Sequence, residues 1–309
     1  MHLQRLTSLE GEAVLPSFSP NSKLIGFLWI HGTYASENAS DLCLIPSPYS
    51  QKTSGNNMQC LTSDGKVTSY SWGPKSNQLV YAEYGSMFVS DLSSHNRVSI
   101  PFNGTIQHPV FDATGLRVYF SGSTLGRGSA IWKENVDGSN LTRMSWTGSD
   151  YSPQLSPDGR EILYVTNYSG VWEPWLIDPG TRTSKSLFDH PEVTGYIFPQ
   201  NPPLAPGSVP SWTPDGRRIV IISNAGGSSG ALIIVTLNVS VTLNLVVAGG
   251  NNQFNMNVFN TVPVYLRAQE ALAGPDGKTI LVLSNDTVSG FPALLLLQFD
   301  LNKTGVYGK

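Results

Sequence analysis

One segment of the sequence has the spacing of a catalytic nucleophile: Gly-Gly-Ser-Ser-Gly at 226–230 matches the pattern Gly-x-Ser-x-Gly. In serine hydrolases this turn joins a strand to a helix, and the sharp bend exposes the serine hydroxyl. Here it is followed by Ala231 to Val235, an apolar and partly β-branched run that is typical of a strand. We therefore interpret the segment as a hairpin loop, expect no catalytic residues, and predict that the protein is not an enzyme.

Metal ligands are not gathered in any one segment. No two of the five histidines have the close spacing of a metal-binding motif; they are His2, His31, His95, His108 and His190. Acidic residues recur in expected hairpin turns and could bind calcium, but turn formation already accounts for them; they are Asp91, Asp137, Asp178 and Asp300. We expect no metal and no cofactor. A metal site is still an open alternative if the fold brings ligands from distant segments together around a central channel.

Aromatic residues give a candidate binding site. Trp172 and Trp175 flank Glu173 and Pro174 beside an expected loop, where two rings could stack on a sugar or hold a peptide. The alternative is that they pack inside the protein, as we expect for most of the seven tryptophans. The full set is Trp29, Trp72, Trp132, Trp146, Trp172, Trp175 and Trp212.

The two cysteines bear on the compartment. Cys43 and Cys60 fall on strands that we expect to be neighbours. A disulfide between them would close a loop of about 17 residues and add about 3 kcal/mol of stability by the chain-entropy estimate. Two buried thiols are the alternative.

Seven Asn-x-Ser/Thr sequons are acceptors for N-glycosylation, where chance would give about four. Each lies in an expected turn or loop; they begin at Asn38, Asn103, Asn140, Asn167, Asn238, Asn285 and Asn302. Only 13% of the residues are charged, about half of the usual quarter, so covalent glycans would help to keep the surface soluble. We favour an extracellular, glycosylated protein, with a periplasmic protein as the alternative.

Charge and hydropathy argue against two other classes of protein, those that bind nucleic acid and those that span a membrane. The net charge is −3 and no cluster of Lys and Arg is present, which argues against a nucleic-acid partner. The apolar run Ala293 to Leu297 is far shorter than the roughly 20 residues of a membrane-spanning helix, so we expect no membrane span. Residues 1–13 lack the charged start and apolar centre of a signal peptide, which counts against secretion.

A repeated turn in the sequence predicts the strands that carry these residues. Ser-Pro-Asp-Gly at 156–159, Thr-Pro-Asp-Gly at 213–216 and Gly-Pro-Asp-Gly at 274–277 each precede a β-branched or aromatic strand. Weaker copies lie at 19–22, 73–76 and 112–115. Proline presets the first central dihedral of a tight turn, Asp closes it and Gly takes a left-handed conformation. A single hairpin unit cannot bury its apolar faces alone. Six such units therefore predict a propeller, in which the units pack as blades around a common axis; a β-sandwich is the alternative.

We therefore predict an all-β, six-bladed propeller of four-stranded antiparallel blades in a single domain, residues 1–309. The expected blades are approximately 14–62, 63–102, 103–145, 146–188, 189–252, and 253–309 together with 1–13. The N-terminal strand would complete the last blade, which removes an open sheet edge, or would pair with another molecule instead. Two segments interrupt the repeat, 189–209 and 251–266, and loops of this length are often functional.

The Pro-Asp-Gly turns, the strands after them and the Trp or Phe strands closed by Asp-x-x-Gly resemble the WD-type repeats of six-bladed TolB-like propellers. The resemblance covers nearly the whole chain and is weaker in the first three units, where Asn21-Ser22, Lys75-Ser76 and Ala113-Thr114 depart from the pattern. It implies a binding scaffold, although related propellers also precede the hydrolase domain of prolyl-oligopeptidase and dipeptidyl-peptidase families.

The leading functional prediction is a non-catalytic extracellular propeller that binds a protein or a glycan, or that assembles with itself through terminal-strand exchange. One alternative is the propeller domain of a serine peptidase whose catalytic domain is not in this chain. Another is a calcium-dependent, lactonase-like enzyme.

Overall fold

The computed structural model describes residues 3–6, 12–30, 40–48, 58–83, 85–94, 96–146, 149–170, 172–187, 210–223, 231–236, 268–277, 279–285 and 292–298. Every regular element within these ranges is a β-strand. Nor does any described segment form a helix that is long and apolar enough to cross a membrane. The chain divides into two compact units, one of residues 10–189 and one of residues 1–9 with 190–309.

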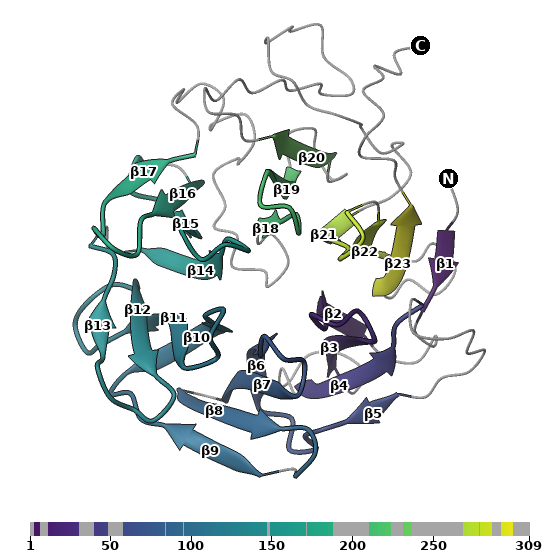
Figure 1. Ribbon diagram of the computed structural model, residues 1–309, viewed down its shortest axis with the longest axis horizontal. Helices are drawn as coiled ribbons and strands as arrows, with labels where there is room; N and C mark the ends of the chain where they lie inside the picture. The colour runs from purple at the N-terminus through teal and green to yellow at the C-terminus, as the bar shows by residue number, and fades with distance from the viewer. Residues whose placement is uncertain are drawn as a thin grey trace, which may run out of the picture. The chain divides into compact units, whose positions relative to one another are not determined.

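The first unit, residues 10–189, contains four antiparallel sheets of four strands, which we call blades one to four (Figure 1). Blade one consists of β2 (Glu12–Phe18), β3 (Leu24–Ile30), β4 (Ser40–Pro46) and β5 (Gln59–Cys60). Blade two consists of β6 (Val67–Trp72), β7 (Gln78–Glu83), β8 (Ser86–Asp91) and β9 (Arg97–Ile100). Blade three consists of β10 (Thr105–Phe111), β11 (Arg117–Ser123), β12 (Ala130–Asn135) and β13 (Thr142–Arg143). Blade four consists of β14 (Asp150–Leu155), β15 (Ile162–Thr166), β16 (Glu173–Ile177) and β17 (Ser184–Ser186).

The second unit contains two further antiparallel sheets. One has three described strands, β18 (Ser211–Trp212), β19 (Arg218–Ser223) and β20 (Ala231–Thr236). The other has the order β1-β23-β22-β21, formed by β1 (Leu3–Arg5), β21 (Ala268–Ala273), β22 (Thr279–Asn285) and β23 (Pro292–Gln298). The N-terminal strand therefore pairs with a strand from the other end of the chain, with Gln4 opposite Leu296.

The repeated turns adopt the conformation that their residues predict. In the Pro-Asp-Gly copies the glycine has a positive φ, as at Gly159 (71°), and its N–H donates to the carbonyl of the residue three before it. In two of the three weaker copies a serine takes the same left-handed conformation, with φ of 61° at both Ser22 and Ser76, while the third has Gly115. The same turn therefore forms without glycine, because the neighbouring strands hold it in place.

The first strand of each sheet in the first unit lies on the inner side and the fourth on the outer side (Figure 1). Each of these inner strands contains a register shift, and in three of them a residue before proline has a positive φ: Leu15, His108 and Ser152. Such bulges bend a strand and re-aim its side chains.

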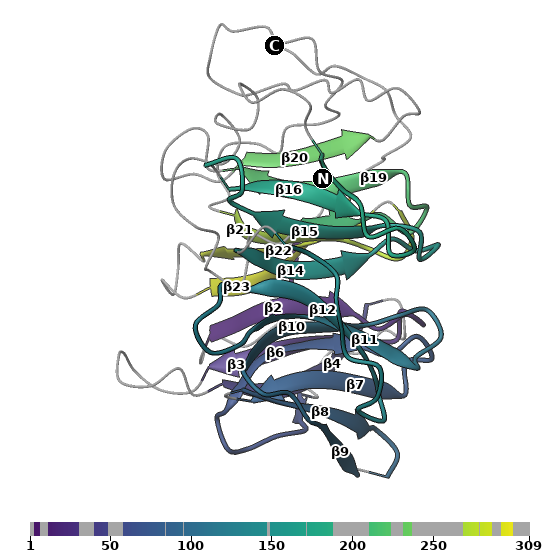
Figure 2. The same cartoon turned by 90° about the vertical axis from the view of Figure 1, so that its left-hand side faces the viewer.

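The core of the first unit lies between neighbouring blades, which pack face to face, and Figure 2 shows their strands from the side. Leu28, Leu42 and Tyr81 belong to the cluster shared by blades one and two. Met87 and Phe120 belong to that of blades two and three. The cluster shared by blades three and four contains Tyr119, Ile131, Met144, Ile162, Tyr164 and Ile177. Because side chains alternate between the two faces of a sheet, each blade can present one apolar face to each of its neighbouring blades.

Candidate binding surface at blades three and four

Trp172 and Trp175 both belong to blade four but contact different partners. Trp172 immediately precedes β16, is partly buried, and its ring centroid lies 5.7 Å from that of Tyr151 on β14. Trp175 is within β16, packs against the core shared with blade three, and meets Tyr168 edge to face at 5.5 Å. The Nε1 atom of Trp175 is buried without a hydrogen-bond partner. The two rings thus form two separate aromatic pairs.

The most exposed aromatic side chains of the described residues are two that the sequence did not single out. Tyr168, in the loop between β15 and β16, is 63% exposed, and Trp146, just after β13, is 57% exposed. The guanidinium carbon of Arg182 lies 5.6 Å from the centre of the Trp146 ring, within the range of a cation–π contact. From the sequence alone, a tryptophan close to a strand is expected to be buried in the core. Only the tertiary structure reveals that Trp146 is exposed.

Buried acidic residues underlie the surface. Asp150 is opposite Thr166, and Thr166 is opposite Glu173, so the three side chains share one face of blade four. All three are buried, and hydroxyl groups hold the carboxylates: Ser145 Oγ donates to Asp150 Oδ2, and Ser186 Oγ donates to Glu173 Oε2 at 3.0 Å. Since Ser145 precedes Trp146 and Tyr168 lies two residues after Thr166, this layer fixes the backbone that presents the exposed rings.

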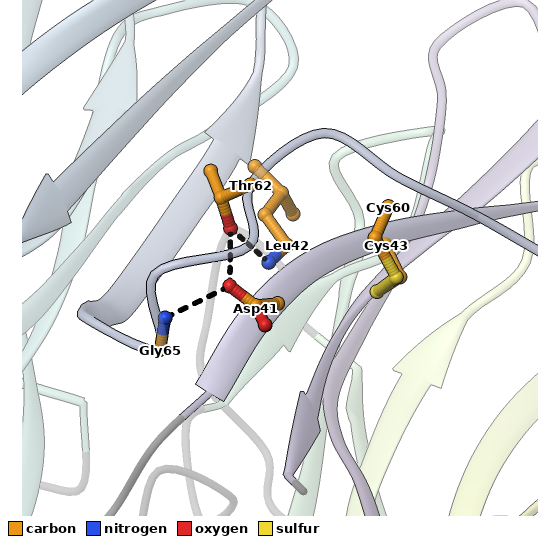
Figure 3. Close-up of a disulfide and its surroundings, with 6 residues drawn as sticks. All are labelled: Asp41, Leu42, Cys43, Cys60, Thr62 and Gly65. Atoms are coloured by element: carbon orange, nitrogen blue, oxygen red, sulfur yellow. Dashed lines mark hydrogen bonds between the residues drawn. A yellow bond between two sulfur atoms is a disulfide. The ribbon is translucent and has the colours of Figure 1, made fainter.

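A related arrangement closes blade one next to the disulfide (Figure 3). Asp41 Oδ1 accepts hydrogen bonds from Thr62 Oγ1 and from the Gly65 N–H, both at 3.0 Å, and Thr62 Oγ1 accepts from the Leu42 N–H at 2.9 Å. In blade three, Ser145 Oγ accepts from the Ile131 N–H in the same way. A hydroxyl shared between a strand N–H and a buried carboxylate is therefore a repeated structural element of this fold.

The disulfide between Cys43 and Cys60 is present as expected, linking β4 to β5, where the two residues are directly opposite each other. The cysteines are 17 positions apart, and both described cysteines are in this bond. Disulfides persist in oxidising compartments and are rare in the cytosol. The bond therefore indicates an oxidising compartment.

The sequons divide into three groups. Asn103, Asn140 and Asn167 are exposed and lie outside strands. Asn285 is the last residue of β22, opposite Pro292, so the expectation of a turn is wrong at this position. The remaining three, Asn38, Asn238 and Asn302, lie outside the described residues.

The described part of the chain contains no group of three or more His, Cys, Asp or Glu side chains placed to hold a metal ion. His108 is on the inner strand β10, where burial lowers its pKa to about 4 and its Nδ1 is buried without a partner. Its backbone N–H donates to Ser69 Oγ of blade two at 2.8 Å. Outside the described ranges lie His2, His31, His95, His190 and Asp300, together with the segment 226–230 and both long interruptions, 189–209 and 251–266. The strand expected after 226–230 is confirmed as β20.

The sequence matches no family model and no curated protein. Its structure is similar to solved structures at low sequence identity. A putative TolB from Agrobacterium tumefaciens has a TM-score of 0.58 and 17% identity over 74% of each chain. An oligogalacturonate lyase in complex with manganese has a TM-score of 0.52 and 14% identity, covering 97% of this chain and 93% of that chain. A chain of a nidogen/laminin complex has a TM-score of 0.58 and 10% identity, covering 86% and 89%.

One prediction made from the sequence is overturned by these similarities. We expected a protein that is not an enzyme, because the segment 226–230 did not fit a catalytic turn and the resemblance implied a binding scaffold. That expectation is wrong as drawn, since oligogalacturonate lyase is an enzyme and has the same propeller fold. What the comparisons show for this chain is the architecture: it is an all-β protein with a TolB-like β-propeller fold built from four-stranded antiparallel blades.

Proposed function

We propose that this protein is a glycan-binding propeller of an oxidising, extracytoplasmic compartment, and that it binds its ligand through aromatic side chains of blades three and four, namely Trp146, Tyr168, Trp172 and Trp175. One observation carries the proposal. Among the described residues, the two large aromatic side chains that are most exposed are Trp146, just after β13 of blade three, and Tyr168, in the β15–β16 loop of blade four.

Of the two ligand classes that the sequence left open, a glycan fits this surface better than a protein. An exposed ring offers a flat apolar face, and the Arg182 guanidinium group, which approaches Trp146, adds hydrogen-bond donors beside one of the rings. Specific sites combine such aromatic faces with a few placed hydrogen-bonding groups. The oligogalacturonate lyase acts on a saccharide and has the same fold, which supports the choice by analogy only.

The binding surface is tested by a glycan microarray, followed by titration of the best oligosaccharide using tryptophan fluorescence. The wild-type protein should bind, and the double variant W146S/Y168S should lose at least about tenfold in affinity, because stacking aromatic rings are typical binding hot spots. Leu125→Ser is the matched control, since Leu125 is fully exposed on blade three and should bind as wild type. Equal binding by the double variant, or no glycan bound by the wild type, would contradict the proposal.

Extracellular location, N-glycosylation and ring closure also belong to this proposal. The disulfide and the exposed Asn103, Asn140 and Asn167 support secretion and glycosylation, and a periplasmic location remains the alternative. The pairing of β1 with β23 supports a single domain of six blades in which the N-terminal strand completes the last one. Expression in a glycosylating host, with mass analysis before and after enzymatic deglycosylation, should show a mass shift that Asn→Gln changes at these three positions reduce.

A further inference from the structure

Glu134 is a buried acidic residue in β12, the third strand of blade three. It is 2% exposed and lies opposite Val118 of β11. By alternation it shares a face with Trp132, and its Oε2 atom is buried with no hydrogen-bond partner. Buried polar atoms are almost always paired, so an unpaired carboxyl oxygen in a strand requires an explanation.

The face that carries Glu134 forms the interface between blades two and three, which lie side by side in Figure 1. The buried apolar residues of this interface come from both blades; they are Val80, Ala82, Met87, Ile100, Ile106, Phe111, Val118 and Phe120. Trp132 and Val136, two positions before and after Glu134, pack against the same cluster. Glu134 therefore places a carboxyl group within an otherwise apolar contact. Burial, with a smaller contribution from Asp137, raises its pKa to about 7.

The described charged groups on the surrounding elements have other partners. On β13, Arg143 Nε donates to the Ser145 carbonyl at 2.8 Å, and on β11, Arg117 pairs with Asp112 at 3.7 Å. At the end of β8 in blade two, Asp91 accepts hydrogen bonds from Ser93 and Ser94. Asp137, in the turn after β12, is negative and opposes ionisation of Glu134.

The other ionisable groups nearby do not neutralise Glu134 either. Lys133 points to the opposite face of β12, by alternation, and Arg97 of β9 pairs with Glu83 at 3.0 Å. His108 on β10 has a pKa lowered to about 4, so it is neutral near pH 7. None of the described cations thus offsets a negative charge on Glu134.

We propose that Glu134 is a proton-dependent latch between blades two and three. In its neutral form the carboxyl group packs within the apolar interface. On losing its proton it requires water, because an isolated charge in an apolar contact is strongly unfavourable, and the contact between β12 and blade two loosens. The protein would therefore be tighter in mildly acidic surroundings than in mildly basic ones.

The direction of the pH dependence follows from linkage. The pKa of Glu134 is about 7 in the folded chain, against an ordinary value of 4.5, so between these values the folded state keeps a proton that the unfolded state releases. The stability present below pH 4.5 is then lost as pH rises to about 7. This one group should increase the unfolding equilibrium constant roughly 25-fold from pH 5.5 to 8.

The test compares the full-length protein with Glu134→Gln and Glu134→Met, neither of which ionises at this position. Urea unfolding from pH 5.5 to 8 gives the stability, and amide hydrogen exchange, corrected for its intrinsic pH dependence, gives the local opening of β12 and β8. Both variants should lose the roughly 25-fold dependence and show pH-independent opening of these strands. Glu161→Gln is the control, because Glu161 is partly exposed and pairs with Lys185 at 3.5 Å; it should keep the wild-type dependence.

The methionine variant guards against an effect of the polar amide in the glutamine variant. Retention of the wild-type pH dependence by both variants would overturn the latch. So would exchange in β12 and β8 that is the same at both ends of the pH range in the wild-type protein.

Discussion

Tyr70 joins blade one to blade two through its hydroxyl group. It accepts a hydrogen bond from Ser17 Oγ at 2.8 Å and donates to the carbonyl of Leu15 at 2.9 Å. Leu15 is one of the residues with a positive φ, so the tyrosine holds a strained backbone position in the inner strand of the neighbouring blade. Gly26 leaves room for the ring, since a Cβ there would come within 2.9 Å of it. Single residues thus determine how closely two blades approach.

Removing this hydroxyl tests its contribution. Tyr70→Phe should lower the free energy of unfolding by about 1–2 kcal/mol, because the partly buried Leu15 carbonyl and Ser17 hydroxyl each lose one hydrogen bond while the ring remains. Tyr168→Phe is the control, since Tyr168 is largely exposed and should change stability by less than about 0.5 kcal/mol. Urea unfolding of both variants measures the difference, and equal stabilities would show that the Tyr70 hydroxyl is dispensable.

At the scale of elements, the outer strands are the shortest parts of the blades. β5 and β13 have two residues each and β17 has three, so few backbone hydrogen bonds hold them. In blade one the disulfide joins β5 to β4 covalently, and Thr62 and Asp41 bind the chain just beyond it. The covalent link therefore secures an edge that its own hydrogen bonds hold weakly.

Loss of the disulfide should destabilise the protein mainly because the unfolded chain gains conformational entropy. The double variant C43S/C60S is expected to lose about 3 kcal/mol of unfolding free energy. Reduction of the wild-type protein with dithiothreitol should lower its urea midpoint toward that of the variant, while the variant itself is unaffected by the reductant. A reduced wild-type protein that unfolds at its oxidised midpoint would contradict this role.

At the scale of the whole molecule, β1 and β23 bring together the two ends of the sequence. A blade that takes its outer strand from the opposite terminus ties the ends of the chain and protects a sheet edge from other chains. The same pairing between molecules would instead produce an assembly.

Deleting residues 1–9 distinguishes pairing of β1 within its own chain from pairing between molecules. Because β1 pairs with β23 of its own chain, we expect the truncated monomer to have a lower melting temperature and to be restored by adding a peptide of residues 1–9. Size-exclusion chromatography with light scattering, together with thermal melting, measures this. A truncated monomer that melts as the full-length protein does but no longer assembles would show that the strand acts between molecules.

The turns and strands follow from local chemistry, which is why they could be predicted. Pro, Asp and Gly at 156–159 limit the backbone to a tight turn, and the alternation after it identifies a strand with one apolar face. The pairing of Cys43 with Cys60 could be proposed from the sequence, since both were expected on neighbouring strands of one blade, 17 positions apart. These features depend on residues that are close together in the sequence.

The contacts between blades were decided only by the tertiary structure. Alternation shows that Glu134 and Trp132 share a face, but it cannot show that this face meets blade two, nor that no cation among the described residues pairs with the carboxyl group there. The exposure of Trp146 is likewise set by how far blade four covers the end of β13. Such contacts join residues far apart in the chain, and their geometry depends on how strands twist and sheets pack, which no local pattern specifies.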